Sequence, residues 1–595
     1  MNTAAILHRP ESEYAYLYKK DLMHIRIRTG RGDIKHVELI HGDPYQLDQT
    51  EWFKQSNHMT KGLTTSTHDY WEIELTAPFR RLSYAFKIEA YDGSILFFGE
   101  HGFSEYTDKN LKAANNYFRL PYFHEADRFT APDWVKETVW YQIFPERFAN
   151  GDLTNDPEGT LAWGSKEHPD REDFFGGDLQ GVIDHLDHLV ELGINGIYFC
   201  PIFKAHSNHK YDTIDYLEID PDFGDKALFK QLVDECHQRG IKVMLDAVFN
   251  HMGDVSPQWQ DVIAHGADSP FADWFHIHDF PVSYTETEDF EFSEDINYDT
   301  FAFTPHMPKL NTANKEVQEY LLTIGKYWIE EFNIDAWRLD VANEVDHRFW
   351  KKFYDACTTI KPDIYILGEI WHSSQRWLEG DEFHAVMNYP FTDAITAYFL
   401  HKTVSLPRMM ENINAQLMLY REQTNQVMFN VLDSHDTPRL LTLAENNKEL
   451  MKQVLAFTYL QKGLPCLYYG DEFGMNGAGD PDCRKCMVWE KEQQDTDMFN
   501  FIKTLIATRK AYQPILSEGK LIWTKADETT GLIEYCYQTP HHTLRATFNS
   551  GNNAITLNES TGVLSYLTHT TDHTLTIEPF GFNVSLINER TDEES

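Results

Sequence analysis

An arginine and a carboxylate stand two residues apart at the end of an apolar run that covers residues 334–344. Residues two apart on a strand point to the same face, so Arg338 and Asp340 are expected to lie side by side. A guanidinium beside a carboxylate favours the ionised acid and lowers its pKa. An acid held in this state suits a nucleophile or an electrostatic stabiliser. A structural ion pair at a strand end would leave the same pattern.

Three further apolar runs also end in acids or histidines, at residues 242–251, 365–372 and 427–436. Each has the length of a buried parallel strand, and acids and histidines are rarely buried without a reason. In a barrel of alternating strands and helices, all the C-terminal strand ends lie on one face, where active sites form. The four runs are therefore expected to bring one set of side chains to a single site: Asp340, Glu369, Asp436, His251, His435 and Arg338.

The order and spacing of these runs resemble the four signature regions of the alpha-amylase superfamily of retaining glycosidases. The regions are residues 246–251, 337–344, 368–372 and 431–439. Met-Pro-Lys-Leu-Asn at 307–311 resembles the extra signature of the neopullulanase, cyclomaltodextrinase and maltogenic amylase subgroup. The similarity extends from near the N-terminus to about residue 588. It implies α-linked glucans as substrates, namely cyclodextrins, maltooligosaccharides and pullulan, with α-1,6 bonds as an open second target beside α-1,4 bonds.

The resemblance also implies a separate catalytic role for each acid. Retaining glycosidases need two carboxyl groups about 5 Å apart, one a nucleophile and one an acid that later acts as a base. Asp340 is interpreted as the nucleophile, because Arg338 would hold it ionised, and Glu369 as the acid/base. Asp436 would hold sugar hydroxyls and stabilise the oxocarbenium-like charge. His251 and His435 would donate hydrogen bonds to the same sugar ring.

Further substrate contacts are implied at three other places. His209, Tyr211 and Asp212 follow a second predicted barrel strand at 193–201. Tyr211 would stack under the sugar at the cleavage point, and the other two would line its pocket. Trp371, just past Glu369, would form an aromatic wall on the acceptor side. In the loop at 479–484, the positions of Asp480 and Arg484 contact sugar in the subgroup. The next pair, Lys485-Cys486, departs from the arginine-proline of that pattern.

Clustered Asn and Asp oxygens at 150–156 and a Gly-Gly-Asp at 176–178 are the hard donors that calcium prefers. The cluster lacks the glycine and closing glutamate of an EF-hand, but it resembles a calcium loop found in part of the subgroup. A polar, turn-rich loop without metal is the alternative. The expected ligands are Asn150, Asp152, Asn155, Asp156, the Gly176 carbonyl and Asp178.

The alternation of predicted strands and helices around these residues indicates an α/β fold, with a (β/α)8 barrel at 126–511. Apolar residues recur with helical period at 179–190 and at 315–332. The stretch between the third and fourth strands is too long for a simple loop, and we expect a small insert at about 252–313 that walls the cleft. A β-domain is predicted at 512–588, followed by an acidic tail at 589–595.

Residues 1–125 read as a β-sandwich, with alternating strands at 22–28 and 34–40 joined by a turn. This stretch resembles the subgroup's N-terminal carbohydrate-binding-type module. Trp52, Tyr70 and Trp71 could stack on sugar, although core or interface packing is the default. In the subgroup, the module of one subunit covers the cleft of the other, so the resemblance implies a homodimer that prefers small or cyclic substrates.

The formal net charge of −41 argues against nucleic acid or an anionic membrane as a partner, because both would repel this chain. No apolar run approaches the length of a membrane span, and the first residues lack a signal pattern. Seven cysteines, an odd number, indicate free thiols and a reducing compartment, so a cytoplasmic location is expected. Cys483 and Cys486 form a CxxC, but no second pair at metal spacing accompanies it, so zinc is not expected.

Two other functions compete with hydrolysis. A glucanotransferase would use the same covalent intermediate and pass it to a sugar hydroxyl, and Glu344 would either tune that partition or form a plain surface ion pair. A non-catalytic carbohydrate-binding protein on the same fold should lack at least one of the acids. Asp340, Glu369 and Asp436 are all present, which favours an enzyme.

Overall fold

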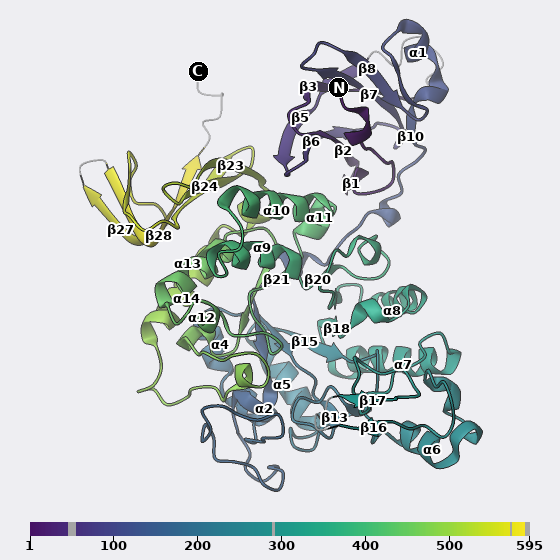
Figure 1. The fold of residues 1–595 in the computed structure, drawn as a ribbon, viewed down its shortest axis with the longest axis vertical. Coiled ribbons are helices and arrows are strands. Elements are labelled where there is room, and N and C mark those ends of the chain that lie inside the picture. The colour runs from purple at the N-terminus through teal and green to yellow at the C-terminus, as the bar shows by residue number, and fades with distance from the viewer. Residues whose placement is uncertain (44, 46–54, 288–291, 572–573, 589–595) are drawn as a thin grey trace.

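Eight parallel strands form the centre of this computed structural model, which describes residues 1–43, 45, 55–287, 292–571 and 574–588 (Figure 1). In chain order they are β11 (Trp140–Ile143), β12 (Gly196–Phe199), β15 (Lys242–Ala247), β18 (Ala336–Leu339), β19 (Tyr365–Gly368), β20 (Ala385–Val386), β21 (Phe429–Val431) and β22 (Leu464–Tyr468). A parallel bridge between Met387 and Phe429, with the Asn388 amide donating to the Phe429 carbonyl at 2.7 Å, brings β20 and β21 together. The predicted barrel is confirmed.

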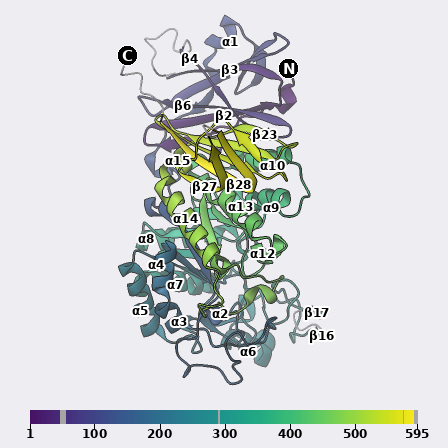
Figure 2. The same ribbon diagram turned by 90° about the vertical axis from the view of Figure 1, so that its left-hand side faces the viewer.

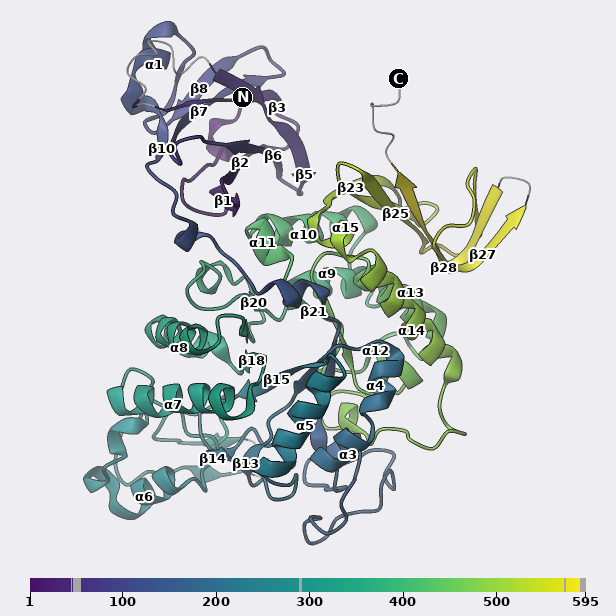
Figure 3. The same ribbon diagram turned by 180° about the vertical axis from the view of Figure 1, so that it is seen from behind.

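Helices alternate with these strands and surround them, as the view from behind shows for α5, α7 and α8 (Figure 3). The main ones are α3 (Leu179–Asp184), α4 (Leu186–Leu192), α5 (Lys226–Gln238), α7 (Lys315–Phe332), α8 (His347–Ile360), α9 (Tyr389–Phe399), α10 (Leu406–Met418), α11 (Glu422–Asn425), α13 (Lys448–Tyr459) and α14 (Thr496–Ala511). Helix α7 spans the predicted 315–332. The Asn314 side chain caps it, and Val317, Leu321, Ile324 and Trp328 are buried.

The predicted helix at 179–190 is two short helices instead of one. His185 separates α3 from α4 because its backbone leaves helical geometry, at φ −112° and ψ 11°. Its ring stacks on Trp489, with centroids 3.5 Å apart. Val190, which we expected on the apolar face, is 45% exposed. The break turns the second half of the segment and moves Val190 to the surface.

The first residues form the predicted sandwich of two antiparallel sheets. One sheet contains β1 (Ala15–Lys19), β2 (Leu22–Gly30), β6 (His68–Thr76) and β5 (Thr60–Thr64). The other contains β4 (Gln55–His58), β3 (Ile34–Gly42), β7 (Leu82–Ala90), β8 (Ile95–Gly99), β9 (Gly102–Glu105) and β10 (Phe118–Leu120), and a short helix, α1 (Asp108–Lys112), follows β9. The two alternating runs fall in β2 and β3, which belong to different sheets. Tyr70 and Trp71 are buried, and Trp52 lies outside the described residues.

The last part of the chain forms an antiparallel sheet that follows the short helix α15 (Gln513–Glu518). Its strands are β23 (Lys520–Asp527), β24 (Leu532–Gln538), β25 (His542–Asn549), β28 (Thr574–Asn588), β26 (Ile555–Leu557) and β27 (Leu564–Thr571). The acidic tail at 589–595 lies outside the described residues. Among the helices of the described chain, none combines the length and apolar character that a membrane crossing requires.

The N-terminal sandwich lies against α10 and α11 and close to the C-terminal sheet (Figures 1 and 2). The Arg26 guanidinium is buried and donates to the carbonyls of Met418 and Tyr420, each at 3.3 Å. The Glu422 amide donates to the Tyr16 hydroxyl at 2.9 Å. Polar contacts therefore fix the sandwich to the helices at one end of the barrel.

The insert between β15 and α7 contains α6 (Pro257–His265) and a small hairpin of β16 (Thr285–Glu286) and β17 (Ser293–Glu294). It returns beside the end of β15, where the Met252 amide donates to the Pro308 carbonyl at 3.1 Å and His251 pairs with Lys309. The motif at 307–311 thus runs next to the C-terminal end of a barrel strand.

Candidate active site

One buried arginine, Arg338, lies among the acidic side chains at the carboxyl ends of three adjacent strands. Arg338, on β18, is fully buried, and its Nη1 is 2.7 Å from Asp340 Oδ1 and 2.8 Å from Asp246 Oδ2. Its Nη2 lies 3.0 Å from Glu369 Oε1. Asp246 is directly opposite Arg338 in the register of β15 and β18, and Glu369 follows β19. Three carboxyl groups thus share one guanidinium.

Asp246 is the first residue of the signature region at 246–251, where the sequence pattern indicates no role for it. Its carboxylate accepts hydrogen bonds from the hydroxyls of Tyr211 at 2.9 Å and Tyr198 at 3.2 Å. A single acid within an apolar run was the available signal, because acids in buried strands are paired or functional. Asp246 fixes both Arg338 and Tyr211 in place.

The charge balance of this cluster differs from the sequence expectation. Burial raises the pKa of the Asp340 carboxyl, repulsion from Glu369 and Asp246 adds to this, and Arg338 only opposes it. Burial likewise raises the pKa of Asp246 to about 6. Arg338 acts in the predicted direction, but burial and the two neighbouring acids outweigh it, so the net shift of the Asp340 pKa is upwards. One guanidinium cannot compensate three buried carboxylates, so the cluster tends to retain a proton.

Glu369 is held on both of its oxygens. The Val341 amide donates to Oε2 at 2.9 Å, and the Trp371 indole donates to Oε1 at 3.1 Å. Val341 has φ of +44°, a left-handed conformation that is costly for a β-branched residue. The Trp371 ring is 46% exposed and stacks on Tyr389, with centroids 3.7 Å apart. The Glu369 carboxyl therefore contacts both a strained backbone amide and a partly exposed aromatic side chain.

A chain of hydrogen bonds joins His435 to the buried acids. Its Nδ1 lies 2.8 Å from Gln142 Nε2, and its Nε2 lies 2.7 Å from the Tyr211 hydroxyl, which reaches Asp246. These partners assign the proton to Nε2, since the Gln142 amide donates to Nδ1. The rings of Tyr211 and His435 are parallel within 2°. Burial lowers the pKa of His435 well below its usual value, so the imidazole is neutral.

His251 is also neutral and fully partnered. Burial lowers its pKa to about 3. Its Nε2 lies 3.1 Å from the Tyr211 carbonyl, its Nδ1 lies 3.3 Å from the Asn250 side chain, and its ring stacks on Phe301. A sugar hydroxyl that bonds to either ring nitrogen of His251 therefore has to share or replace a bond within the protein.

The loop at 479–484 brings Arg484 beside Asp436. Arg484 Nη2 lies 3.6 Å from Asp436 Oδ1, Nη1 lies 2.8 Å from Asp480 Oδ1, and Nε donates to the His435 carbonyl at 2.9 Å. Burial raises the pKa of Asp436, and Arg484 and Arg338 oppose this shift. The departure at Lys485-Cys486 leaves Arg484 in contact with this site.

A cleft of about 910 Å³ opens over these side chains. Most of the predicted contact residues line it, but two do not. Asp212 turns into its own loop, where it accepts bonds from the Ser207 hydroxyl and, at 3.2 Å, from the Ser207 amide. Arg338 is buried behind the carboxylates. Several further residues line the cleft although no contact with substrate was predicted for them: Arg171, Phe174, Asn208, Phe301, Met307 and Asn343.

The residues predicted to bind calcium lie close together, and two of their side-chain oxygens have no hydrogen-bond partner. The Oδ1 atoms of Asn150 and Asn155 are buried without a hydrogen-bond partner, and Asn150 Nδ2 donates to Asp156 Oδ1 at 2.8 Å. Gly176 has φ of +82°, and a side chain there would collide with Asp156 and Asn150. Unpartnered amide oxygens beside a carboxylate are a donor set that fits calcium.

Two expected ligands in that loop already have protein partners. Asp178 caps α3 and accepts from the amides of Gly151 at 3.0 Å and Asp152 at 2.9 Å. Asp152 is exposed and accepts from the Thr154 amide at 2.9 Å. Within the described residues, no group of three or more His, Cys, Asp or Glu side chains is arranged to hold a metal. A cation here would depend on amide and backbone oxygens.

Glu146 and Arg147 connect this loop to the substrate cleft, and no sequence motif predicts a role for either residue. Both side chains are buried and bonded to each other. Glu146 Oε1 accepts from the amides of Phe175 and Gly176, the latter at 2.9 Å. Arg147 donates to the carbonyl of Asp173 at 2.8 Å and to that of Arg484 at 2.6 Å. Adjacent charges after a strand carry no distinctive signal in a sequence.

Known proteins resemble the chain over nearly its whole length. Residues 142–514 match the family described as alpha amylase, catalytic domain, and residues 1–124 match alpha amylase, N-terminal ig-like domain. The intracellular maltogenic amylase of Bacillus subtilis (strain 168) is 55% identical over 552 residues, which cover 93% of this chain and 92% of that protein.

A cyclomaltodextrinase of Geobacillus thermopakistaniensis (strain MAS1) is 49% identical over 554 residues, with coverage of 93% and 92%. A solved cyclomaltodextrinase structure matches with a TM-score of 0.90 and 44% identity, over 99% of this chain and 100% of that one.

Proposed function

Because the chain belongs to the alpha-amylase family and is a glycoside hydrolase, we propose that it cleaves α-1,4-glucosidic bonds with retention, in cyclodextrins, maltooligosaccharides and pullulan. The observation that carries this proposal is the shared contact of Asp340 and Glu369 with one buried guanidinium, at 2.7 and 3.0 Å. Two carboxyl groups tethered to one small planar group are close together, as retention through a covalent intermediate requires.

In the first step, protonated Glu369 gives its proton to the glycosidic oxygen while an Asp340 oxygen attacks the anomeric carbon. The bond to the leaving sugar breaks, and an ester to Asp340 forms. Glu369 then takes a proton from water, and the hydroxide attacks the same carbon and frees Asp340. Asp436 and Arg484 hold the hydroxyls of the sugar that carries the reacting carbon, and Tyr211 stacks beneath it.

The hydrogen bonds of the two acids support this division of roles. Asp340 makes a hydrogen bond with Arg338 that favours its anion, whereas Glu369 lies beside the open face of Trp371, where the leaving group departs. An α-glucan that fills the cleft also removes water, which strengthens each of these contacts.

Transfer to a sugar hydroxyl is the second candidate reaction, because it uses the same ester. Glu344 lines the cleft and pairs with Lys309 at 2.9 Å. A charged pair at the acceptor side can orient either water or a second sugar. We propose that transfer accompanies hydrolysis when an acceptor sugar is abundant, with hydrolysis as the main reaction.

We also propose a structural calcium ion in the loop of Asn150, Asp152, Asn155, Asp156, Gly176 and Asp178. The unpartnered Oδ1 atoms of Asn150 and Asn155 support it. The ion would supply a fixed positive charge that holds the loop together. Through Glu146 and Arg147, the loop geometry reaches Arg484, so the ion has a positioning effect and takes no part in the chemistry.

A homodimer is proposed from exposed aromatic side chains on the N-terminal sandwich. Tyr45, Phe79 and Tyr122 are exposed, and the Arg81 guanidinium lies 5.0 Å from the ring of Tyr45 and 5.4 Å from that of Phe79. Aromatic residues grouped around arginine are typical of protein interfaces. A partner's sandwich over the cleft would exclude bulky starch. A cytoplasmic location is proposed from the intracellular relative.

Product analysis tests the main proposal. The enzyme is incubated with β-cyclodextrin, pullulan or starch, and the released sugars and their initial anomeric form are followed by NMR. We expect α-anomers first, and faster turnover of cyclodextrin than of starch. Initial release of β-anomers would contradict the covalent intermediate, and preferred turnover of starch would contradict the proposed substrate class.

A further inference from the structure

Three consecutive backbone carbonyls beside the cleft each accept a hydrogen bond from a different buried side chain. The three pairs are Arg439 Nε to Cys483 at 2.9 Å, Arg147 Nη1 to Arg484 at 2.6 Å, and the Tyr469 hydroxyl to Lys485 at 2.6 Å. The three donors follow β21, β11 and β22, which are neighbours in the barrel. Because every residue has a backbone carbonyl, this contact does not depend on the side chains at 485 and 486, where the sequence departs from the subgroup pattern.

Arg439 links the strand side of this arrangement to the loop side. Its Nη1 donates to the Tyr469 carbonyl at 2.7 Å and lies 3.3 Å from Asp471 Oδ1, while its Nε holds the Cys483 carbonyl. The guanidinium carbon lies 4.3 Å from the ring centroid of Tyr468 and 4.8 Å from that of Tyr469. Arg439 is therefore fixed by hydrogen bonds in its plane and by aromatic rings against its face.

Two buried acids balance the charge of Arg439 with one proton between them. Burial raises the pKa of both Asp433 and Asp471, and the hydrogen bond between the two carboxyl groups favours the proton on Asp471. The Asp433 carboxylate accepts from the Leu440 amide at 2.7 Å. One anion therefore accompanies one guanidinium, so Arg439 is held without an excess of buried charge.

The backbone that these side chains hold carries the groups that contact Asp436 and His435. The His435 carbonyl accepts from Cys483 Sγ at 3.1 Å and from Arg484 Nε at 2.9 Å. Arg484 Nη2 lies 3.6 Å from Asp436 Oδ1. A shift of the backbone on either side of Arg484 would therefore move its guanidinium away from Asp436.

We propose that Arg439 and Tyr469 are positioning residues for the hydrolytic reaction. Together with Arg147, they fix the backbone on both sides of Arg484 and so place its guanidinium beside Asp436. Neither Arg439 nor Tyr469 is among the described residues that line the cleft, so each acts through Arg484. The inference rests on the proposed function, in which Arg484 holds hydroxyls of the reacting sugar. Groups that bind a substrate act best when their supports are rigid.

A double-mutant cycle with Tyr469→Phe and Arg484→Ala tests the proposal, with kcat/KM on β-cyclodextrin as the measurement. Phenylalanine keeps the ring beside Arg439 and removes only the hydroxyl. We expect Tyr469→Phe to lower kcat/KM about fivefold, which corresponds to the loss of one hydrogen bond. In the Arg484→Ala background the same substitution should change kcat/KM by less than about twofold, because residues that act through one another are not additive. A purely structural role would give the same factor in both backgrounds.

Arg439→Lys is the second variant, since lysine keeps a positive charge beside Asp471 but lacks the paired donors that reach two carbonyls. It should lower kcat/KM about tenfold or more, and this loss should also shrink when Arg484 is alanine. Tyr469→Phe decides the question if Arg439→Lys folds poorly, which the melting temperature reports.

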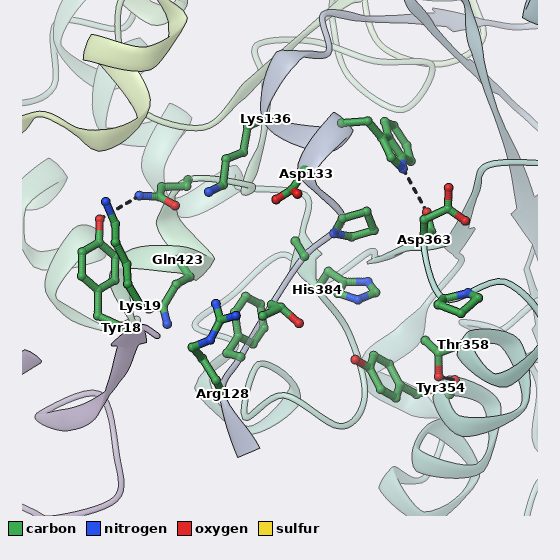
Figure 4. A pocket seen from close by; sticks show the side chains of 17 residues that line it. Tyr18, Lys19, Arg128, Asp133, Lys136, Tyr354, Thr358, Asp363, His384 and Gln423 are labelled. Atoms are coloured by element: carbon green, nitrogen blue, oxygen red, sulfur yellow. Dashed lines mark hydrogen bonds between the residues drawn. The ribbon is translucent and has the colours of Figure 1, made fainter. Parts of the chain in front are cut away.

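Tyr365→Phe is the matched control, because it also removes a buried hydroxyl that donates to a backbone carbonyl, that of Val427 at 2.8 Å. Tyr365 begins β19, and its ring stacks on His384, which lines a cavity of about 640 Å³ between the N-terminal sandwich and the barrel (Figure 4). This position is at the N-terminal strand ends, away from Arg484. The control should keep kcat/KM within about twofold of the unaltered enzyme, since Tyr365 shares no partner with the loop.

Three results would overturn the proposal: an unchanged kcat/KM in Tyr469→Phe, the same fold loss from Tyr469→Phe with and without the Arg484 side chain, or an equal loss in Tyr365→Phe. Full activity of Arg484→Ala alone would instead refute the proposed sugar contact of Arg484, and with it the need to position this residue.

Discussion

The Arg147 guanidinium donates to the backbone carbonyl of Arg484 across 2.6 Å, and it thereby ties the end of the first barrel strand to a substrate loop. Its other terminal nitrogen donates to the Asp173 carbonyl. A single buried side chain thus holds two loops that border the cleft. Arg147 touches no reacting atom, so its contribution is to position Arg484 and its neighbour Asp436.

Arg147→Met should lower both stability and kcat/KM. The substitution leaves Glu146 buried without its partner, which costs about 3–5 kcal/mol of unfolding free energy. Adding Glu146→Gln should restore much of the melting temperature but not kcat/KM on cyclodextrin, because Arg484 stays unanchored. Lys166→Met, which affects a partly exposed ion pair with Asp173, is the control. Full activity in the double variant would show that Arg147 serves stability alone.

Asp340→Asn and Glu369→Gln should each reduce hydrolysis by at least ~10³-fold, which corresponds to ~4 kcal/mol of barrier. Both substitutions keep the size of the side chain, so the melting temperature should change little. Glu344→Gln, on the same cleft, should stay within about tenfold of the unaltered enzyme. A rate within about tenfold for either catalytic variant would refute the assigned roles.

Calcium should raise the melting temperature, and a chelator should lower it, because an ion bound only to the folded chain stabilises it by about 2.7 kcal/mol at a hundredfold excess over Kd. Asn155→Ala removes one unpartnered oxygen and should abolish this response, and Asp152→Ala should weaken or abolish it. Asp170→Ala, an exposed position in the same region, should respond normally. Melting curves that are indifferent to calcium and to chelator in the unaltered enzyme would exclude the ion.

Acid should destabilise the fold from about pH 6.5 downwards. Burial lowers the pKa of His384 to about 4 from an ordinary value of 6.5. The unfolded chain therefore binds the proton first as the pH falls, and stability is lost until the folded pKa is reached, by about 3 kcal/mol for this group. His384→Gln keeps an acceptor for the Ile366 amide and should flatten this slope in denaturant titrations. A slope unchanged by the substitution would locate the acid sensitivity elsewhere.

Phe79→Ser combined with Tyr122→Ser should shift the enzyme from dimer to monomer in sedimentation experiments, because both exposed rings belong to the proposed interface. The ratio of cyclodextrin to starch turnover should fall at the same time, since an uncovered cleft admits polymer. Tyr91→Ser, at another exposed position on the sandwich, is the control. An unaltered enzyme that sediments as a monomer at all concentrations would contradict this interface.

The strands that carry the reacting groups could be predicted because their ends combine apolar runs with acids and histidines. Strand β20 could not, because Ala385 and Val386 are only two residues and show no periodicity. The orientation of Asp212 also escaped prediction, since its bonds to Ser207 depend on how one loop folds back. The role of Arg147 depends on a contact across more than three hundred residues, which no local pattern contains. The direction of the Asp340 pKa shift required knowledge of burial and of Asp246.

The docking of the sandwich on α10 and α11 can occur only after the ribosome has made both helices. Tyr16 and Arg26 bond to groups that follow them by about four hundred residues in the chain. At about 5–20 residues per second, a ribosome needs roughly 15–60 s to deliver those partners after the sandwich is complete. During that interval the buried Arg26 face is exposed to other nascent chains. A sandwich that folds within that interval presents the polar groups of Tyr16 and Arg26 to water, which can bond to them until the barrel is complete.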